Sequence, residues 1–379
     1  MAPKKISEFN FGQYDARREY ERDKDFFVSS FIPPVTLSLD SLNSGNRFIV
    51  IGRKGAGKTA AMFYLKELVQ QRGYLVDLIS FFDDLNEDDL RTVSQSQTFS
   101  LLDARWDGNN VVGSYNFKDV WKRTILTKIA TVLEEGGISN KFTKFCLKNT
   151  KPQRGIFDGL LKGLQVAMIE PIGSYRFEFS YDPALNSKDK IPIHDFNSIA
   201  ADALLEHSRE HKVYLIFDEL VVSTLKIKSD EYNLRLAMIR DLVRSIAEMN
   251  DFFCRYSMDV HVITNLRPEV RNEINRRDAE ISKVIDDNDV PLEWHRNADT
   301  QSAIISILKS KIQHGVQPPL ISSEVDAMLP DKIDFGGTPT PFQQFVLNQS
   351  WMRPRDMVRL LKCYAKINSD HTAISSEGI

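Results

Sequence analysis

The segment Gly52–Thr59 constrains this chain more than any other, and it reads Gly-Arg-Lys-Gly-Ala-Gly-Lys-Thr. It matches the pattern G-x-x-x-x-G-K-[ST] at every fixed position. The preceding run Arg47–Ile51 predicts a short buried strand, and Ala60–Val69 after it carries apolar residues at helical spacing. A strand, a loop and a helix in this order indicate an α/β fold, and they argue against a chance match in a glycine-rich turn.

This loop has the chemistry of a phosphate site. Its glycines permit backbone angles that turn successive N–H groups towards a β-phosphate, and the following helix adds the positive end of its dipole. We expect Lys58 to reach the β- and γ-phosphates and the Thr59 hydroxyl to hold Mg²⁺. ATP is the expected nucleotide. The expected nucleotide contacts are Gly52, Arg53, Lys54, Gly55, Ala56, Gly57, Lys58, Thr59 and Ala60.

A second signature follows much later in the chain. The apolar run Val213–Phe217 predicts a buried strand, and it ends in Asp218-Glu219, the arrangement called Walker B. We expect Asp218 to complete the Mg²⁺ shell from the second sphere. Glu219 is expected to polarise a water for attack on the γ-phosphate. An acidic pair at a strand end is otherwise a turn or a helix cap.

A third strand-like run, Val260–Asn265, has polar residues at its carboxyl end. Because the strand ends at that edge of a parallel sheet face the ligand crevice, Asn265 or Thr264 is a candidate to orient the attacking water. Arginines follow, partly on a helix entered through Pro268. They are candidates to complete a neighbouring subunit's site, or else they belong to an ordinary surface helix: Arg267, Arg271, Arg276 and Arg277.

The last part of the chain opens at Trp294 and predicts helices over 300–312 and 351–367. The proline of Arg353-Pro354-Arg355 suits the first turn of a helix. Arginines at a helix start are not favoured by the dipole, which makes a ligand-facing role for Arg353 and Arg355 more attractive than a local one.

Composition sets limits on partners and location. The chain has 379 residues and a formal net charge of −3, which gives no overall attraction to nucleic acid or to an anionic membrane. Its three cysteines lie far apart, so neither a zinc knuckle nor a disulfide framework is indicated. No apolar run is long enough to cross a bilayer. We therefore expect a soluble, cytoplasmic protein with no membrane partner.

Charge is nevertheless concentrated locally. Residues 141–162 carry basic side chains with interleaved aromatics, which is one pattern for binding single-stranded nucleic acid. A solvated basic face is the alternative. The basic residues are Lys141, Lys144, Lys148, Lys151, Arg154 and Lys162. The segment 156–169 is apolar. In Ser174–Tyr181 the residue types alternate, which predicts a β-strand.

Taken in order, these motifs resemble the additional-strand P-loop ATPases of the AAA+ and STAND-like kind. A narrower likeness, to a bacterial P-loop ATPase family, rests on Phe11-Gly12-x-Tyr14-Asp15-Ala16, Gly52-Arg53-Lys54-Gly55, Asn265-Leu266-Arg267, Leu292-Glu293-Trp294 and the cluster Arg353–Asp356. The resemblance implies a mostly parallel sheet flanked by helices, with the Walker A strand central. It also implies a C-terminal helical lid with a sensor-2 arginine, and hydrolysis that depends on assembly.

The expected domain organisation follows from these landmarks. Residues 1–45 form an aromatic-rich N-terminal arm, 46–290 the P-loop ATPase core and 291–379 the helical lid. Lys58 and Asp218 are 160 residues apart, which is wider than a minimal core needs. We therefore expect a large inserted helical and β region over about 95–195.

The expected function is Mg-dependent ATP hydrolysis by a switch or motor within a larger assembly, through self-association or an effector partner. The resemblance suggests roles in DNA-related processes or phage defence. The alternatives are a P-loop kinase acting on a small molecule and a non-hydrolysing ATP-bound scaffold. A GTPase is a further alternative, but the only approach to the guanine-reading tetrapeptide is the imperfect Asn186-Ser187-Lys188-Asp189.

Overall fold

The computed structural model divides the chain into two compact units. One unit comprises residues 1–38, 51–67 and 290–379, and the other comprises 39–50 and 68–289. The residues that the structure describes are 4–34, 36–37, 39–43, 47–80, 117–148, 191–220, 230–294 and 303–375. Several predicted features lie outside these residues, among them the apolar segment 156–169, the strand Ser174–Tyr181 and the tetrapeptide Asn186-Ser187-Lys188-Asp189.

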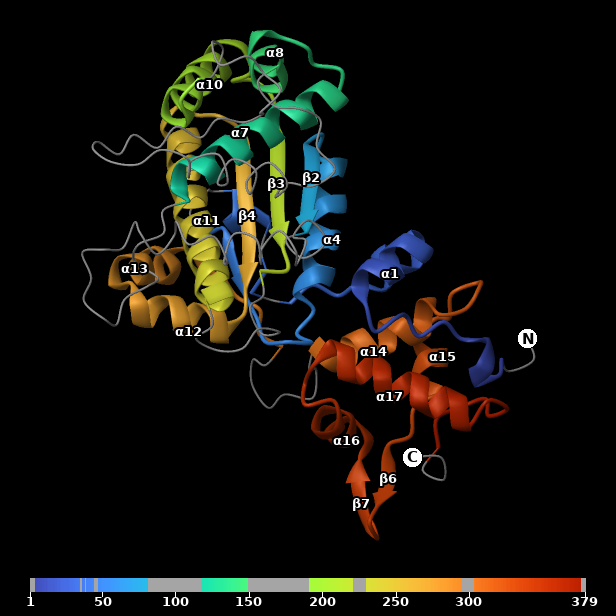
Figure 1. Ribbon diagram of the computed structural model, residues 1–379. Helices are drawn as coiled ribbons and strands as arrows, with labels where there is room; N and C mark the ends of the chain where they lie inside the picture. The colour runs from blue at the N-terminus through green and yellow to red at the C-terminus, as the bar shows by residue number, and fades with distance from the viewer. Residues whose placement is uncertain are drawn as a thin grey trace. The chain divides into compact units, whose positions relative to one another are not determined.

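A five-stranded parallel sheet is the centre of the fold, with the strand order β2-β3-β4-β1-β5. Figure 1 labels three of its strands, β2, β3 and β4, side by side. Its strands are β1 (Ile49–Ile51), β2 (Leu75–Ser80), β3 (Val213–Asp218), β4 (Val260–Leu266) and β5 (Asp289–Pro291). Every residue of β3 and β4 is buried. Such continuous burial is typical of parallel strands covered on both faces, and it explains why these strands read as unbroken apolar runs. The predicted α/β class is confirmed.

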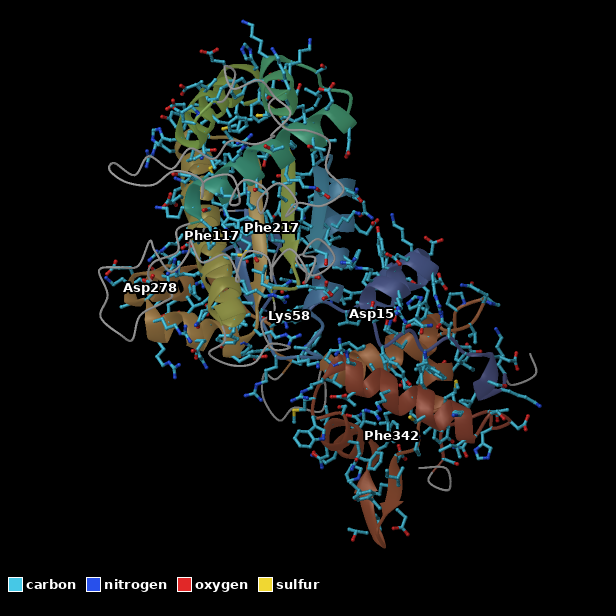
Figure 2. All side chains as sticks on the ribbon, viewed as in Figure 1. Asp15, Lys58, Phe117, Phe217, Asp278 and Phe342 are labelled. Carbon is cyan, nitrogen blue, oxygen red and sulfur yellow. The ribbon has the colours of Figure 1, made fainter. Side chains whose placement is uncertain are left out.

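Helices flank the sheet. In the second unit, α7 (Lys118–Glu135) packs on β2 and β3, and α11 (Asp230–Arg255) packs on β4 and α7. The other helices of this unit are α3 (Leu39–Asn43), α8 (Lys141–Lys148), α10 (Ile193–His207), α12 (Pro268–Arg277) and α13 (Ala279–Asn288). Asp278, labelled in Figure 2, caps α13 by accepting the Ile281 N–H at 3.3 Å.

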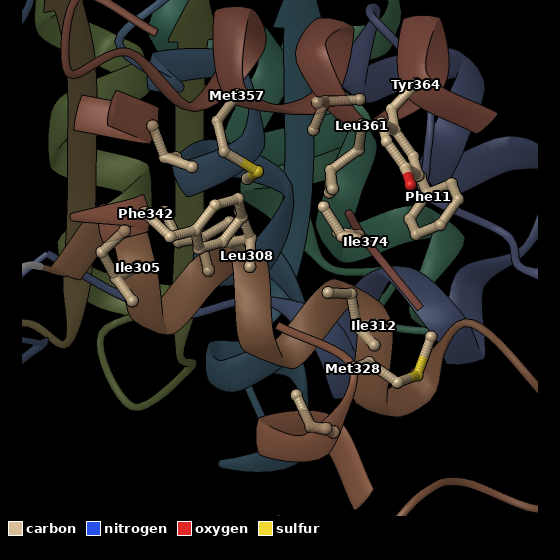
Figure 3. Packing of buried hydrophobic residues seen from close by; sticks show 14 of the residues in the cluster. Phe11, Ile305, Leu308, Ile312, Met328, Phe342, Met357, Leu361, Tyr364 and Ile374 are labelled. Carbon is tan, nitrogen blue, oxygen red and sulfur yellow. The ribbon is translucent and has the colours of Figure 1, made fainter. Parts of the chain in front are cut away.

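The first unit is mostly helical. Its N-terminal arm forms η1 (Ile6–Glu8), α1 (Ala16–Arg22) and α2 (Lys24–Ser30). The C-terminal part forms α14 (Ala303–His314), α15 (Ser322–Ala327), β6 (Lys332–Phe335), β7 (Thr338–Pro341), α16 (Phe342–Gln349) and α17 (Pro354–Ile367). One apolar core joins both parts, and Figure 3 shows Phe11 of the arm beside Leu361 and Tyr364 of α17. The antiparallel β6–β7 hairpin was not predicted.

A buried ion pair also holds the arm against α14. Lys311 on α14 pairs with Glu19 on α1, and its Nζ also donates to Ser30 Oγ at 2.9 Å. The same ammonium lies 4.5 Å from the centre of the Phe26 ring. Burial lowers the pKa of Lys311, and the carboxylate of Glu19 opposes that shift. The arm is therefore a structural part of this unit.

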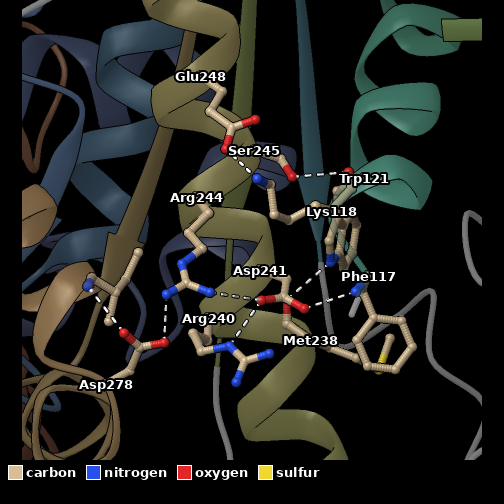
Figure 4. A network of polar contacts seen from close by, with 11 residues as sticks. Phe117, Lys118, Trp121, Met238, Arg240, Asp241, Arg244, Ser245, Glu248 and Asp278 are labelled. Carbon is tan, nitrogen blue, oxygen red and sulfur yellow. Dashed lines mark hydrogen bonds and ion pairs between the residues drawn. The ribbon is translucent and has the colours of Figure 1, made fainter. Parts of the chain in front are cut away.

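In the second unit, Asp241 on α11 organises a buried polar network (Figure 4). Its carboxylate accepts the Phe117 N–H at 2.7 Å and the Arg240 Nε–H at 2.8 Å, and it is 1% exposed. Arg244 lies between Asp241 and Asp278, 2.5 Å from the latter. These contacts join the start of α7 to α11 and to the cap of α13.

We expect Asp241→Asn to lower the free energy of unfolding by about 2 kcal/mol, because buried hydrogen bonds to a charged group are each worth about 1.5–3 kcal/mol. Urea unfolding followed by circular dichroism measures the change. The matched control is Glu248→Gln on the same helix, where a partly exposed carboxylate pairs with Lys118 and Lys122. Removing that charge should cost under about 1 kcal/mol. Equal losses in both variants would contradict a special role for Asp241.

Candidate functional site

The loop Gly52–Thr59 forms a tight turn between β1 and α4 (Lys58–Gln71). Gly55 and Gly57 both have φ of +84°, a conformation that L side chains rarely adopt. Lys58 is the first residue of α4, so the N–H groups of the first helical turn have no partner within the helix. A turn of this kind, followed by a helix start, is suited to hold an anion.

Lys58 lies over the loop itself, at the position labelled in Figure 2. Its Nζ donates to the carbonyl oxygens of Gly52 at 2.7 Å and of Arg53 at 3.2 Å. A Cβ at Gly52 would lie 3.1 Å from Lys58 Cγ and 3.2 Å from Leu292 Cβ, so a side chain there would crowd the lysine. The loop thus holds a lysine ammonium next to its own backbone.

Residues far along the chain hold the loop in place within the same unit. Trp294 donates its indole N–H to the Ala56 carbonyl at 2.8 Å, and the Leu292 N–H donates to the Ile51 carbonyl at 2.6 Å. No contact of Trp294 was predicted from the sequence. The only signal was its place in Leu292-Glu293-Trp294.

The predicted arginines Arg353 and Arg355 also lie at this loop. A Cβ built at Gly55 would be 3.5 Å from Arg353 Cδ and 3.7 Å from Arg355 Cβ. The Arg355 N–H approaches the Gly55 carbonyl at 3.4 Å. Arg355 is exposed, whereas Arg353 lies 3.9 Å from Asp356. The start of α17 therefore brings two arginines to the loop Gly52–Thr59.

The second unit carries a polar cluster at the carboxyl ends of adjacent strands. Asn265 on β4 donates to Asp218 Oδ1 at 2.5 Å, and the Glu219 N–H donates to the same oxygen at 2.7 Å. Ser80 pairs in register with Asp218, and its hydroxyl donates to Glu219 Oε2 at 2.6 Å. The structure thus brings together Asp218, Glu219 and Asn265, and it adds Ser80, which the sequence did not reveal.

Glu219 has a strained backbone. Its φ is +65°, which is unusual for a residue other than glycine. Left-handed non-glycine residues cost about 1–3 kcal/mol and tend to occur at functional sites. Here the strain is balanced by bonds at both ends of the residue, from its N–H to Asp218 and from Ser80 to its carboxylate. Glu219 is therefore held in one orientation.

Asp218 fits a role in metal binding. The carboxylate is 1% exposed, and its Oδ2 has no hydrogen-bond partner among the residues that the structure describes. A buried carboxylate oxygen without a partner is costly, and a metal-bound water is one group that would satisfy it. Within the described ranges, no cluster of three or more histidine, cysteine or acidic side chains is placed to hold a metal ion.

The other predicted arginines are engaged near α12. Arg271 pairs with Asp286 and lies 3.1 Å from Asp289. Glu273 accepts from Arg276 and Arg277, each at 2.7 Å. Arg267 is 3.8 Å from Glu269. Each of these side chains has an acidic partner within the chain.

Part of the predicted basic stretch is described as α8. Lys141, Lys144 and Lys148 are exposed there, whereas Phe142 is buried and Phe145 stacks on Phe196 at 5.2 Å between ring centroids. The described aromatics of this stretch thus pack inside the unit. The rest of the stretch, with Lys151, Arg154 and Lys162, lies outside the described residues.

Comparison with protein-family models, with curated proteins and with solved structures finds no match to this chain. Within the part of the chain that the structure describes, no helix combines the length and apolarity needed to cross a membrane. The fold and the two clusters define an α/β protein with a five-stranded parallel sheet, a lysine-bearing glycine loop and a buried aspartate at a strand end.

Proposed function

We propose that this protein binds ATP with Mg²⁺ and hydrolyses it, as an additional-strand P-loop ATPase. The observation that carries the proposal is the buried Asp218 at the carboxyl end of β3, with one oxygen held by Asn265 and the other without a partner among the described residues. A phosphate-loop sequence elsewhere in the chain supplies the complementary chemistry.

The strand order supports this assignment. β4 lies between β1, which leads into the loop Gly52–Thr59, and β3, which ends in Asp218. A strand inserted between the Walker A and Walker B strands is what the name of the additional-strand group describes. β1 is an interior strand between β4 and the edge strand β5, whereas the middle position of the sheet belongs to β4 and not to the expected Walker A strand.

Each residue would have a defined task. The N–H groups of the loop and the Lys58 ammonium would bind the β- and γ-phosphates. Thr59 and Asp218 would hold Mg²⁺, whose charge neutralises that of the phosphates. Glu219 would accept a proton from the attacking water, and Asn265 would keep Asp218 in place. Arg353 and Arg355 would offset the charge that develops on the γ-phosphate oxygens.

The test is a phosphate-release assay on the purified full chain with ATP and Mg²⁺, over a range of protein concentrations. We expect Mg-dependent release of inorganic phosphate, and a rate per chain that rises with concentration where hydrolysis depends on assembly. Phosphate release that EDTA does not inhibit would contradict the proposal. Transfer of phosphate to an added small-molecule acceptor would favour a kinase, and tight binding without turnover would favour a scaffold.

A positioning role for Ser80 gives a sharper prediction. Ser80→Ala removes the hydrogen bond to Glu219, so we expect kcat to fall about tenfold, the equivalent of one hydrogen bond of about 1.4 kcal/mol. KM for ATP should not change, because Ser80 would not contact the nucleotide. Ser80→Thr keeps the hydroxyl and suits a strand, and it should stay within about twofold of wild type. A rise in kcat on Ser80→Ala would contradict this role, because it would mean that the hydrogen bond from Ser80 holds Glu219 in an unproductive orientation.

We further propose, from the resemblance alone, that hydrolysis drives a switch or motor in an assembly, by self-association or with an effector protein. DNA-related work and phage defence are the settings that the resemblance suggests. Comparing the mass of the chain by size-exclusion chromatography with light scattering, with and without a non-hydrolysable ATP analogue, tests the self-association.

A further inference from the structure

The C-terminal helix α17 has one apolar and one basic face. Its apolar face is buried in the core of the first unit, as Figure 3 shows for three of its residues; the buried residues are Met357, Val358, Leu361 and Tyr364. Its basic residues recur at intervals of four, three and four, which places them along one side of a helix. They are Arg355, Arg359, Lys362 and Lys366.

The charge of this basic side is not balanced within the described chain. From Trp351 to Ile367 there are five basic residues and one acidic residue, Asp356, although the whole chain has a net charge of −3. Arg355, Arg359 and Lys366 are exposed, and none of them forms an ion pair with a described carboxylate. Like charges at helical neighbour positions destabilise a helix by about 0.2–0.5 kcal/mol per pair. A polyanion would relieve this repulsion.

Two exposed aromatic rings accompany these charges. Trp351, directly before α17, is 75% exposed, and the Arg353 guanidinium lies 5.9 Å from its ring centroid. Tyr14 is 47% exposed, with Lys362 Nζ 4.9 Å from its ring centroid. Trp351 and Met352 both have positive φ, near +50°, a conformation that is costly for such residues and presents the indole to solvent. Exposed rings beside cationic groups are the elements from which single-strand binding surfaces are built.

We propose that the α17 basic face binds single-stranded nucleic acid; this face comprises Tyr14, Trp351, Arg355, Arg359, Lys362 and Lys366. The basic side chains would contact phosphates, and the two rings would stack on bases. An anionic membrane fits less well, because a helix that lies in a bilayer needs a free apolar face, and that of α17 is buried in the protein core. This site is separate from the lysines of α8, whose neighbouring aromatic rings pack inward.

The position of the face suggests coupling to the phosphate loop. Arg355 is both the first residue of the basic series and the residue whose N–H approaches the Gly55 carbonyl at 3.4 Å. A strand bound along α17 would therefore bias the start of that helix. This coupling rests on the proposed ATPase function, whereas binding itself does not, so the experiment below is done without nucleotide.

The test is fluorescence anisotropy of labelled single-stranded oligonucleotides, dT and U homopolymers, with the full chain at several salt concentrations. With about four phosphates contacted, the slope of log affinity against log salt should be about −3. Arg359→Gln combined with Lys366→Gln should weaken binding at least about tenfold at low salt and halve the slope. Trp351→Ala should weaken binding about fivefold or more through lost stacking.

The matched control is Lys141→Gln combined with Lys144→Gln on α8, which removes the same charge from another exposed helix. This variant should bind like wild type, and melting curves of both double variants should match that of wild type. Three results would overturn the proposal: no binding at low salt, loss of binding in the α8 variant instead of the α17 variant, or binding to phosphatidylserine vesicles with none to oligonucleotides.

Discussion

Lys58→Ala is expected to weaken ATP binding by more than about a hundredfold, the equivalent of about 2.7 kcal/mol. A charge-assisted contact to the phosphates is lost, and no other side chain of the loop can replace it from the same helix start. In the structure the Lys58 ammonium donates to the loop carbonyls of Gly52 and Arg53, so a melting curve of the variant must accompany the binding measurement to show that the fold is retained. Isothermal titration with Mg-ATP measures the loss.

The control for this prediction lies in the same loop. Lys54 is an exposed lysine whose backbone, and not its side chain, is expected to serve the phosphates. Lys54→Ala removes an identical charge and should change the affinity for Mg-ATP by less than about threefold, because interactions of solvent-exposed charges contribute little free energy. An affinity of Lys58→Ala near that of wild type would contradict the phosphate-site assignment itself.

The long, buried elements of this fold were predictable from the sequence. β3 and β4 are buried along their whole length, so their apolar runs stand out from the polar ends that follow them. The helix after the loop was expected from Ala60, and α4 begins at Lys58, because the glycine turn itself leads into the first helical turn. Pro268 and Pro354 open α12 and α17, as expected for proline in a first turn.

The short strands have hydrophobic patterns that are too weak to predict them from the sequence. β5 has three residues, of which only Val290 is buried, and the β6–β7 hairpin buries only Ile333, so neither shows an alternation that sets it apart from a loop. The helix α10 is a different case, since Phe196, Ala200 and Leu204 recur every four residues and are buried. That helix could have been predicted from its helical spacing of apolar residues, by the same rule that predicted a helix after the loop Gly52–Thr59.

The candidate site was predictable only where a motif is local. Asp218 and Asn265 each follow an apolar run, and neighbouring parallel strands bring such ends together. Ser80 has no local signal, because its bond to Glu219 depends on β2 lying next to β3 in a register that pairs Ser80 with Asp218. Trp294 reaches Ala56 across 238 residues of sequence, which no spacing rule can reveal.

Glu219→Gln is expected to retain Mg-ATP while slowing hydrolysis by about a hundredfold or more, as loss of a general base usually does. The amide has the size of the carboxylate, and its oxygen can still accept the Ser80 hydroxyl, so the strained backbone at Glu219 keeps its support. What the amide lacks is the ability to take a proton from water. Single-turnover hydrolysis and equilibrium ATP binding, measured on the same preparation, separate the two effects.

Two further variants decide whether the loss is specific to Glu219. Glu293→Gln makes the same change at an exposed position and should leave turnover within about twofold, under about 0.5 kcal/mol in the barrier. Asp218→Asn should act differently. It removes the negative charge of a carboxylate whose Oδ2 has no partner among the described residues, so hydrolysis should need a higher Mg²⁺ concentration. If Glu219→Gln turns over like wild type, Glu219 is not the base. The fixed orientation that Ser80 and Asp218 give it would then serve only the local fold.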